Sequence, residues 1–241
     1  MSWIVVVGAV LVPGLLSAQG LQDFDPLSRD NLSVSLKMLS ILTLLTLAPT
    51  ILLLTTAFPR IVIVLGFVRR ALSTQEVPPN QVIIGLALIL TFFVMGPTLN
   101  RIKNEALLPY LDGMPDAEAL EIGVSHLRDF MWRQTDPDSL DVMIELSTDA
   151  EVDAAEEMTL DQVPLFTLVP AFLLSELKRA FEMGFMIYLP FVVIDLVVAS
   201  TLISMGMLVL PPVLISLPFK ILVFVLVDGW EIIVTQLVAS F

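Results

Sequence analysis

The charged side chains of the C-terminal part of the chain stand in an almost entirely apolar sequence. Between Met183 and Phe241 only four residues carry charge: Asp195, Lys220, Asp228 and Glu231. Ionisable groups are costly in apolar helices and normally pair with one another or face a wet interior. We therefore expect Lys220 to bind a carboxylate of Asp195 or Glu176, with Asp228 two turns along the same helix.

Glu176 is the partner that we favour for Lys220, within one chain or between subunits. It belongs to a polar cluster that also contains Ser175, Lys178 and Arg179. A second interpretation of this cluster is local helix support on the surface. Glu176 and Arg179 are three residues apart, and Lys178 and Glu182 are four apart, which are the spacings of neighbours on a helix. We predict that these charges make contacts between helices or between subunits.

Little else in the sequence could do chemistry. The chain has no cysteine and one histidine, His126, which excludes disulfides, thiolate nucleophiles and His-rich metal centres. Asp195 could serve a proton-linked role, but the Gly-x-Gly-Asp context of an intramembrane aspartyl protease is absent. No Gly-rich phosphate loop or nucleophile elbow occurs. We predict no enzymatic activity, no cofactor and no metal.

The composition indicates a membrane protein. Of the 241 residues, 56% are hydrophobic and only 15% are charged, whereas soluble domains carry about 25% charge. The net charge of −13 argues against a nucleic-acid partner, because phosphate binding needs clustered Lys and Arg. We predict an all-α integral membrane protein with about four long hydrophobic helices arranged as two hairpins.

The order of apolar and polar segments divides the chain into four parts. Residues 1–20 are typical of a signal peptide, although a retained N-terminal segment is the alternative. Residues 21–100 contain the first hairpin, whose turn at Arg69 and Arg70 the positive-inside rule places in the cytoplasm. Residues 101–163 form an acidic region. Residues 164–241 form the second hairpin, which we expect to contain two spans after Met183, separated by Met205–Pro212.

The acidic region accounts for nearly all of the excess negative charge. Residues 98–164 contain 16 acidic and four basic residues, which predicts a solvated periplasmic segment, with calcium binding as the minor alternative. Leu120, Val124, Leu127 and Met131 recur at helical spacing after Pro115. Arg101, Lys103, Lys178 and Arg179 flank the apolar helices on this outer side. Either those helices do not cross the membrane in the usual way, or an assembly buries these cations.

Several motifs together resemble one family. They are Phe58-Pro59-Arg60, Pro78-Pro79-Asn80-Gln81, Phe130–Thr135, the long block from Pro170 to Phe185 with its continuation Tyr188–Leu196, Ser204–Met207, Pro211-Pro212, Ile215–Lys220 and Phe224–Trp230. This pattern is similar to the FliP family of flagellar biosynthetic proteins, whose injectisome relatives share most of the long block. The likeness covers roughly residues 40–100 and 164–241.

The resemblance implies a function in type III protein export. Several FliP copies would form a closed helical cone with FliQ and FliR in the basal body at the bacterial inner membrane, near FlhA and FlhB. Unfolded flagellar subunits would leave the cytoplasm through this gate. An export gate of a virulence secretion system is the alternative within the family. A small-solute or ion transporter and a scaffold that never conducts are alternatives of a different class.

A conduit for unfolded chains must seal when idle, and apolar side chains can seal a narrow ring by excluding water. Unbranched methionine adapts its shape readily. We therefore predict that Met205, Gly206, Met207, Leu208 and Val209 form a channel gasket, with ordinary packing of a turn as the alternative. The sequence departs from the family in two places. Many family members carry a run of methionines in this loop, whereas here Met207 is followed by Leu208 and Val209. The segment Asp136-Pro137-Asp138 is expected to end or bend the periplasmic helix.

Overall fold

The computed structural model describes residues 29–74, 77–147, 160–207 and 210–241. Within these ranges the regular structure is helical and no strand occurs, which confirms the predicted all-α fold class. The predicted signal peptide and the gasket residues Leu208 and Val209 lie outside the described residues. The chain divides into two compact units, one ending at Thr50 and the other beginning at Ile51.

Three helices are long and apolar enough to cross a membrane. The candidate spans are Leu36–Leu54, Asn80–Leu111 and Leu165–Ser204. The first lies in α2 (Arg29–Leu54), an apolar helix that carries Pro49 in its interior. A fourth candidate is the pair α9 (Pro212–Leu226) and α10 (Gly229–Ala239), which is bent by 64° at its break. These candidates agree with the four hydrophobic helices expected from the sequence.

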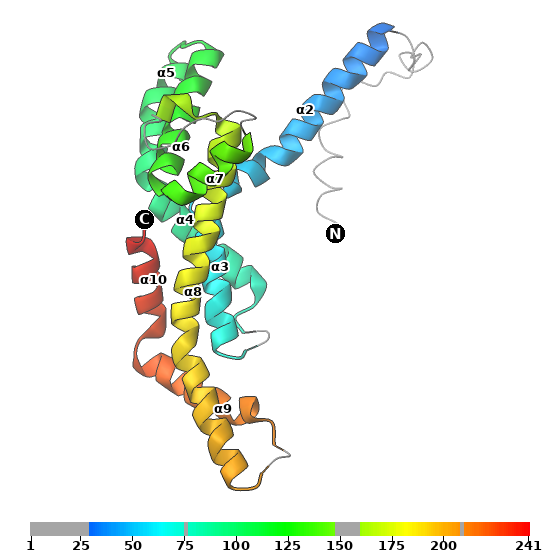
Figure 1. Cartoon of the computed structure of the whole chain (residues 1–241). Coiled ribbons are helices and arrows are strands. Elements are labelled where there is room, and N and C mark those ends of the chain that lie inside the picture. Colours follow the sequence, from blue (N-terminus) through cyan, green and yellow to red (C-terminus); the bar gives the residue numbers. More distant parts are fainter. Residues whose placement is uncertain (1–28, 75–76, 148–159, 208–209) are drawn as a thin grey trace. The chain divides into compact units, whose positions relative to one another are not determined.

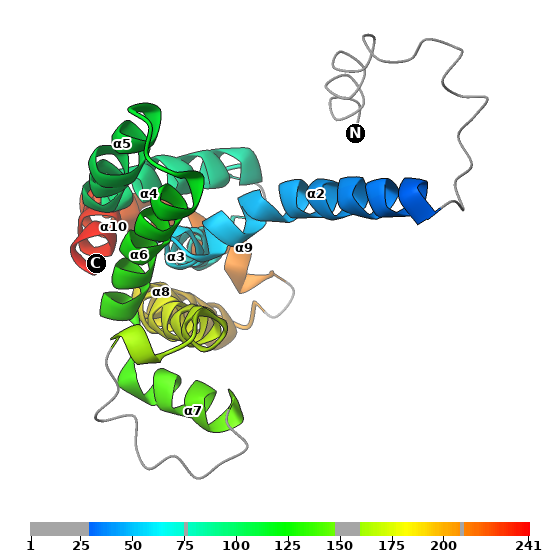
Figure 2. The same ribbon diagram turned by 90° about the horizontal axis from the view of Figure 1, so that it is seen from above.

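The second unit is built around α3 (Phe58–Ala71) and α8 (Leu165–Ser204), which pack along each other. Apolar residues recur every three or four positions on the buried face of α3, as an amphipathic helix requires: Ile61, Val64, Leu65 and Val68. They meet Leu168, Ala171 and Phe172 of α8 in the core. Figure 1 shows α3 beside α8, and Figure 2 shows α7 on the other side of α8.

The acidic region folds into short helices that continue from α4 (Asn80–Ile102). A π-helical turn η1 (Lys103–Leu107) and α5 (Leu108–Leu111) precede α6 (Asp116–Gln134). The latter is the amphipathic helix predicted after Pro115. It ends where the sequence predicted, because Thr135 is extended and Asp136 precedes Pro137, which disfavours helical backbone at that residue. Then follow α7 (Pro137–Ser147) and the 3₁₀ turn η3 (Leu160–Gln162).

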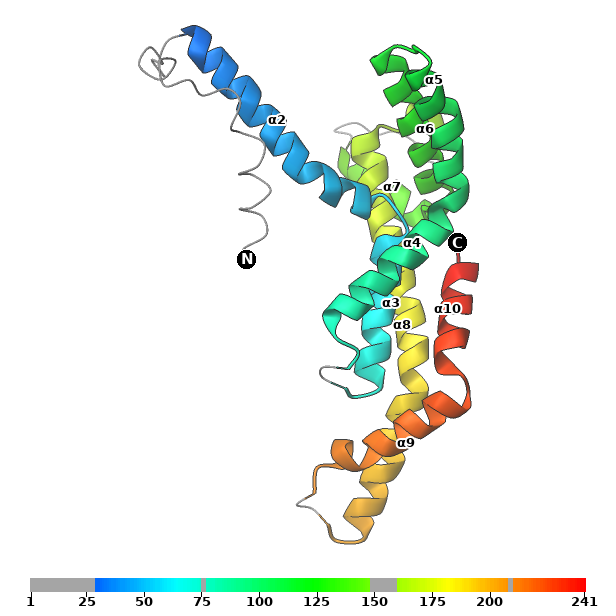
Figure 3. The same cartoon turned by 180° about the vertical axis from the view of Figure 1, so that it is seen from behind.

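The main difference from the sequence prediction concerns α8. The charged cluster at Ser175–Glu182 lies inside this helix, which begins at Leu165 and not near Met183. Its 40 residues correspond to about 60 Å, roughly twice the hydrocarbon thickness of a bilayer. From behind, Figure 3 shows α8 continuing past α3 toward the turn that leads into α9.

Candidate functional site

The first polar cluster of the second unit is centred on Arg60 of α3. The side chains of Arg60 and Glu176 are both 0% exposed and form an ion pair between α3 and α8. Arg60 Nε donates to Glu176 Oε2 at 3.0 Å, and Arg60 Nη2 also bonds to Glu176 Oε1. Two charges of opposite sign thus lie in contact within the protein interior, where neither could remain alone without a large desolvation cost.

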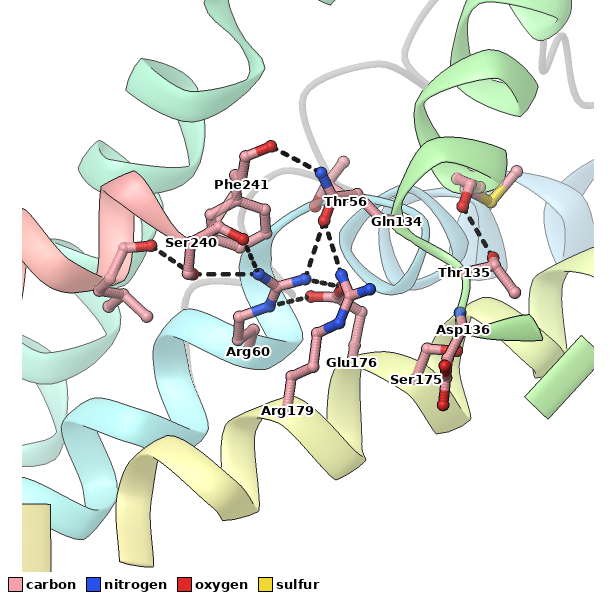
Figure 4. Close-up of polar contacts among 12 residues, drawn as sticks. Thr56, Arg60, Gln134, Thr135, Asp136, Ser175, Glu176, Arg179, Ser240 and Phe241 are labelled. Atoms are coloured by element: carbon pink, nitrogen blue, oxygen red, sulfur yellow. Dashed lines mark hydrogen bonds and ion pairs between the residues drawn. The ribbon is translucent and has the colours of Figure 1, made fainter. Parts of the chain in front are cut away.

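Gln134, the last residue of α6, is the second centre of this cluster (Figure 4). Its Oε1 accepts hydrogen bonds from Arg60 Nη2 at 3.1 Å and from Arg179 Nη1 at 3.0 Å. Its Nε2 donates to the carbonyl oxygen of Phe241 at 2.8 Å. Since both guanidinium groups need an acceptor and the carbonyl needs a donor, the orientation of the amide is fixed.

Arg60 also binds the segment that follows α10. Its Nη1 donates to the carbonyl oxygen of Ser240 at 2.8 Å and to Ser240 Oγ at 3.0 Å. The guanidinium carbon lies 3.8 Å from the centroid of the Phe241 ring, within the range of a cation–π contact. Arg60, Gln134, Glu176, Arg179, Ser240 and Phe241 are called the Arg60 cluster below. It joins α3, α6, α8 and the end of α10.

The second polar cluster is centred on Lys220 of α9. Lys220 Nζ donates to Asp195 Oδ2 and to Ser73 Oγ, both at 2.6 Å, and to the carbonyl oxygen of Ala71 at 3.2 Å. The hydroxyl of Ser216 donates to Asp195 Oδ1. The side chain of Lys220 is 1% exposed and that of Asp195 is 30% exposed. These five residues, the Lys220 cluster, connect the end of α3 with α8 and α9.

The pair predicted between Lys220 and Glu176 is wrong within the chain. Lys220 binds Asp195, while Glu176 binds Arg60. The sequence analysis predicted no role for Arg60, which is the partner of Glu176. One signal could have found it: Arg60 is the single charge between two long apolar runs, so it also needed a carboxylate. A Lys220–Glu176 contact between two copies of the chain stays a prediction.

The cations expected on the outer side are bonded to the acidic region of the same chain. Lys178 Nζ lies 2.6 Å from Asp136 Oδ2, and Arg101 Nη1 lies 3.5 Å from Asp129 Oδ2. The side chains of both cations are half exposed. The hydrogen bonds of Lys178 and Arg179 thus reach residues outside α8. Lys178 and Arg101 are thus paired with carboxylates within one chain.

Asp228 lies apart from both clusters. It is exposed, adopts a left-handed backbone conformation with φ 51°, and precedes α10. Its carbonyl oxygen accepts hydrogen bonds from the amides of Glu231 and Ile232. The Phe224 ring lies against the following residue, Gly229, where an added Cβ would come within 2.4 Å of the ring. Asp228 therefore marks the bend between α9 and α10.

The loop after α8, here called the Met-Gly-Met loop (Met205–Met207), ends the helix in a defined way. Gly206 has φ +78°, and its amide donates to the carbonyl oxygen of Ile203 at 2.9 Å. The amide of Met207 donates to the carbonyl oxygen of Leu202 at 3.0 Å. This is a Schellman motif, which favours glycine at the left-handed position. The side chain of Met205 is 72% exposed, so the loop presents an apolar, adaptable surface.

No group of three or more potential metal ligands gathers among the described residues. His126 lies beside Glu105, with Nε2 3.0 Å from a carboxylate oxygen. The polar contacts of the two clusters are ion pairs and hydrogen bonds between helices.

Comparison with known proteins decides the family. A family model described as "FliP family" matches residues 41–237. "Flagellar biosynthetic protein FliP" of Bacillus subtilis (strain 168) is 53% identical over 213 residues, which are 88% of this chain and 94% of that protein. The chain belongs to the FliP family. The protein of the same name from Aquifex aeolicus (strain VF5) is 46% identical over 212 residues, or 88% of this chain and 87% of the relative.

The FliP match includes the centres of both clusters and the Met-Gly-Met loop, because Arg60, Glu176, Met205 and Lys220 all lie within residues 41–237. A third relative, "Flagellar biosynthetic protein FliP" of Pectobacterium carotovorum subsp. carotovorum, is 48% identical over 87% of this chain and 80% of its own length. The FliP resemblance stated from the sequence is thereby confirmed over most of the chain.

Proposed function

We propose that this chain is a core subunit of the flagellar type III protein export gate. The observation that carries the proposal is the position of the Met-Gly-Met loop, an exposed apolar turn at the end of a long helix of a FliP-family chain. Several copies assemble with FliQ and FliR, near FlhA and FlhB. The conduit that they form exports unfolded flagellar subunits.

The proposed gasket consists of Met205, Gly206, Met207, Leu208 and Val209. The side chains of Met205 and Met207 are exposed within one chain, so they are free to meet their counterparts from neighbouring copies. A narrow ring of such apolar side chains excludes water and ions. Flexible methionine side chains can move aside for a passing polypeptide and close again afterwards.

Assembly with further subunits is supported by the last part of α8. After Phe191 only one residue of this helix, Leu202, is buried within the chain. Leu196, Val197 and Ile203 are exposed. Apolar surface of this extent is covered either by lipid or by other subunits. In the proposed gate, neighbouring subunits cover it.

The proposed location is the bacterial inner membrane, within the flagellar basal body. Three helices long enough to cross a membrane support this location. The acidic region faces the periplasm, and residues 1–20 act as the signal peptide. Energy for export comes from other components, because the chain acts as a conduit and has no enzymatic activity of its own.

The gasket is tested by replacing Met205 and Met207 together with alanine in the full chain. We expect assembly to remain and ion leakage across the membrane to rise several-fold, measured as loss of membrane potential in cells. Met186→Ala is the matched control, since Met186 is 70% exposed on α8 but lies outside the loop. Unchanged leakage in the assembled double variant would contradict the gasket and favour a scaffold.

The mass of the detergent-solubilised complex tests the assembly. We expect a large hetero-oligomer that contains several copies of this chain. A second experiment deletes the chain from cells, and we expect these cells to lose motility without any loss of solute uptake. A lone monomer of the mass of this chain, or lost uptake of a small solute, would overturn the proposal in favour of a transporter.

A further inference from the structure

We infer that the Lys220 cluster positions the Met-Gly-Met loop and couples this loop to the turn that follows α3. The inference rests on the proposed function, since it states what holds the gasket in place. The residues that it concerns, Lys220, Asp195 and Ser73, are not part of the proposed gasket.

All three donors of the Lys220 ammonium group are used. They reach the Asp195 carboxylate, the Ser73 hydroxyl and the Ala71 carbonyl oxygen. Ala71 is the last residue of α3, so its carbonyl has no partner inside that helix. A cation at the C-terminal end of a helix satisfies such a carbonyl and interacts favourably with the helix dipole. Lys220 of α9 thus caps α3.

The residue that receives the second bond is held in an unusual conformation. Ser73 has φ 56°, a left-handed backbone conformation that is rare for residues other than glycine. Its amide donates to the carbonyl oxygen of Arg70 at 2.9 Å, and its hydroxyl accepts from Lys220. Such conformations persist only where the surroundings hold them, and they concentrate at clamps and switch regions.

The carboxylate side of the cluster lies at the base of the hairpin formed by α8 and α9. Asp195 precedes the Met-Gly-Met loop on α8, and Ser216 and Lys220 follow it on α9. Asp195 accepts from both of them. The two arms that carry the loop are therefore tied together by one carboxylate, and Lys220 ties the same point to α3.

Two apolar contacts lie before Asp195 on α8. Upstream, α8 is held closely against α3, since an added Cβ on Gly184 would lie 2.4 Å from the Phe67 ring. Downstream, Phe191 packs near Phe224, with ring centroids 6.3 Å apart. Beyond Asp195 only Leu202 of α8 is buried, so we expect the bonds of Lys220 to set the position of the loop relative to α3. A displacement of the turn after α3 is then transmitted to the loop.

The test uses the absence of cysteine from the chain. A single reporter, Met205→Cys, is labelled with a membrane-impermeant maleimide in the assembled complex in the membrane. Lys220→Met keeps the length of the side chain but removes all three donors, so we expect the labelling rate at the reporter to rise several-fold. Lys220→Arg keeps donors for the same acceptors and should restore most of the original rate.

Two controls separate positioning from general loosening. Lys178→Met removes a half-exposed cation from α8 and should leave the reporter at position 205 unchanged. A second reporter, Met186→Cys, lies before Asp195 on α8 and should keep its rate in the Lys220→Met variant. An unchanged rate at position 205, or an equal rise at both reporters, would overturn the inference.

Ser73→Gly covers the case in which the Lys220→Met chain fails to accumulate. Glycine accepts the positive φ of this position at no cost, while the hydroxyl acceptor of Lys220 is lost. We expect a smaller rise at the Met205→Cys reporter, and no rise would overturn the inference. The labelling rate reports loop position whether or not the loop seals a conduit. The ion leakage of the Met205/Met207 alanine variant tests the gasket separately.

Discussion

The two polar clusters differ in how completely the protein encloses them. In the Arg60 cluster the ion pair of Arg60 and Glu176 is fully buried, and four elements supply the members of the cluster. In the Lys220 cluster the cation is buried but the Asp195 carboxylate is 30% exposed. A fully buried ion pair cannot lose one partner without stranding a charge, whereas a partly exposed carboxylate can be rehydrated. We therefore expect the loss of one charged partner to cost more stability in the Arg60 cluster than in the Lys220 cluster.

The largest expected effect follows from breaking the Arg60 cluster. Arg60→Met leaves the buried Glu176 without its hydrogen-bonded partner, which costs about 3–5 kcal/mol of unfolding free energy. We expect a strong fall in the unfolding temperature of the purified chain in detergent. Arg101→Met is the control, because its pair with Asp129 is half exposed.

The double variant Arg60→Met/Glu176→Leu sharpens this result. Removing both charges removes the stranded carboxylate, so the double variant should be more stable than Arg60→Met alone. A double variant that is less stable than either single variant would show that the cluster does not act through charge burial.

A smaller effect is expected at the close contact of Gly184 on α8 with Phe67 on α3. In Gly184→Ala the new Cβ would lie 2.4 Å from Phe67 Cδ2 and 3.0 Å from Phe67 Cβ, so the ring cannot simply swing away. Overpacking of this kind costs about 1–3 kcal/mol. Thermal unfolding of the purified chain measures this loss of stability. Adding Phe67→Leu to Gly184→Ala should restore part of it.

Gly66→Ala on α3 is the matched control for this contact. Nothing lies within 4 Å of a Cβ at Gly66, and alanine favours helix more than glycine does. We expect equal or slightly higher stability. A loss in Gly66→Ala as large as that in Gly184→Ala would contradict the packing argument.

Gln134→Leu is expected to reduce stability less than Gly184→Ala but more than a change of a surface charge, and mainly at the end of α10. The change leaves the Phe241 carbonyl without its donor and takes one acceptor from Arg60 and Arg179. Buried polar groups without partners cost about 1–3 kcal/mol each. Hydrogen exchange of the α10 amides should become faster than in Gln236→Leu, where an exposed glutamine of α10 is replaced. Equal exchange in the two variants would disprove that Gln134 holds the end of α10.

The smallest effect is expected for Lys178→Ala. The ion pair between Lys178 and Asp136 is half exposed on the side of the cation, and solvent screens such pairs. We expect an unfolding temperature within experimental error of the original. A fall similar to that of Arg60→Met would show that the acidic region is bound more tightly than exposure indicates.

Much of the fold could be predicted from the sequence, but fewer of the side-chain contacts. Long apolar runs are enough to predict helices, and the spacing of Leu120, Val124 and Leu127 predicted α6. The start of α8 was missed because Glu176, Lys178 and Arg179 look like the polar end of a helix. The acidic region supplies bonding partners for Lys178 and Arg179, and this allows one helix to pass through the polar cluster.

The pairing of charges could not be predicted because it depends on tertiary contacts. Arg60 and Glu176 are far apart in the sequence and meet only when α3 packs on α8. Lys220 was correctly expected to need a carboxylate, and Asp195 was one of its two candidates. The choice between them is made by the crossing of α9 over α8, which apolar periodicity does not reveal.

The proposed gasket requires that loops of several copies meet, and cross-linking tests this most directly. A single cysteine, Met207→Cys, is introduced into the cysteine-free chain and oxidised in the assembled complex. Disulfides form only when the Cα atoms come within about 7 Å. We predict disulfide-linked dimers of this chain, and none with Met186→Cys. A Met207→Cys chain that assembles and reacts with maleimide, yet never forms dimers, would contradict the account.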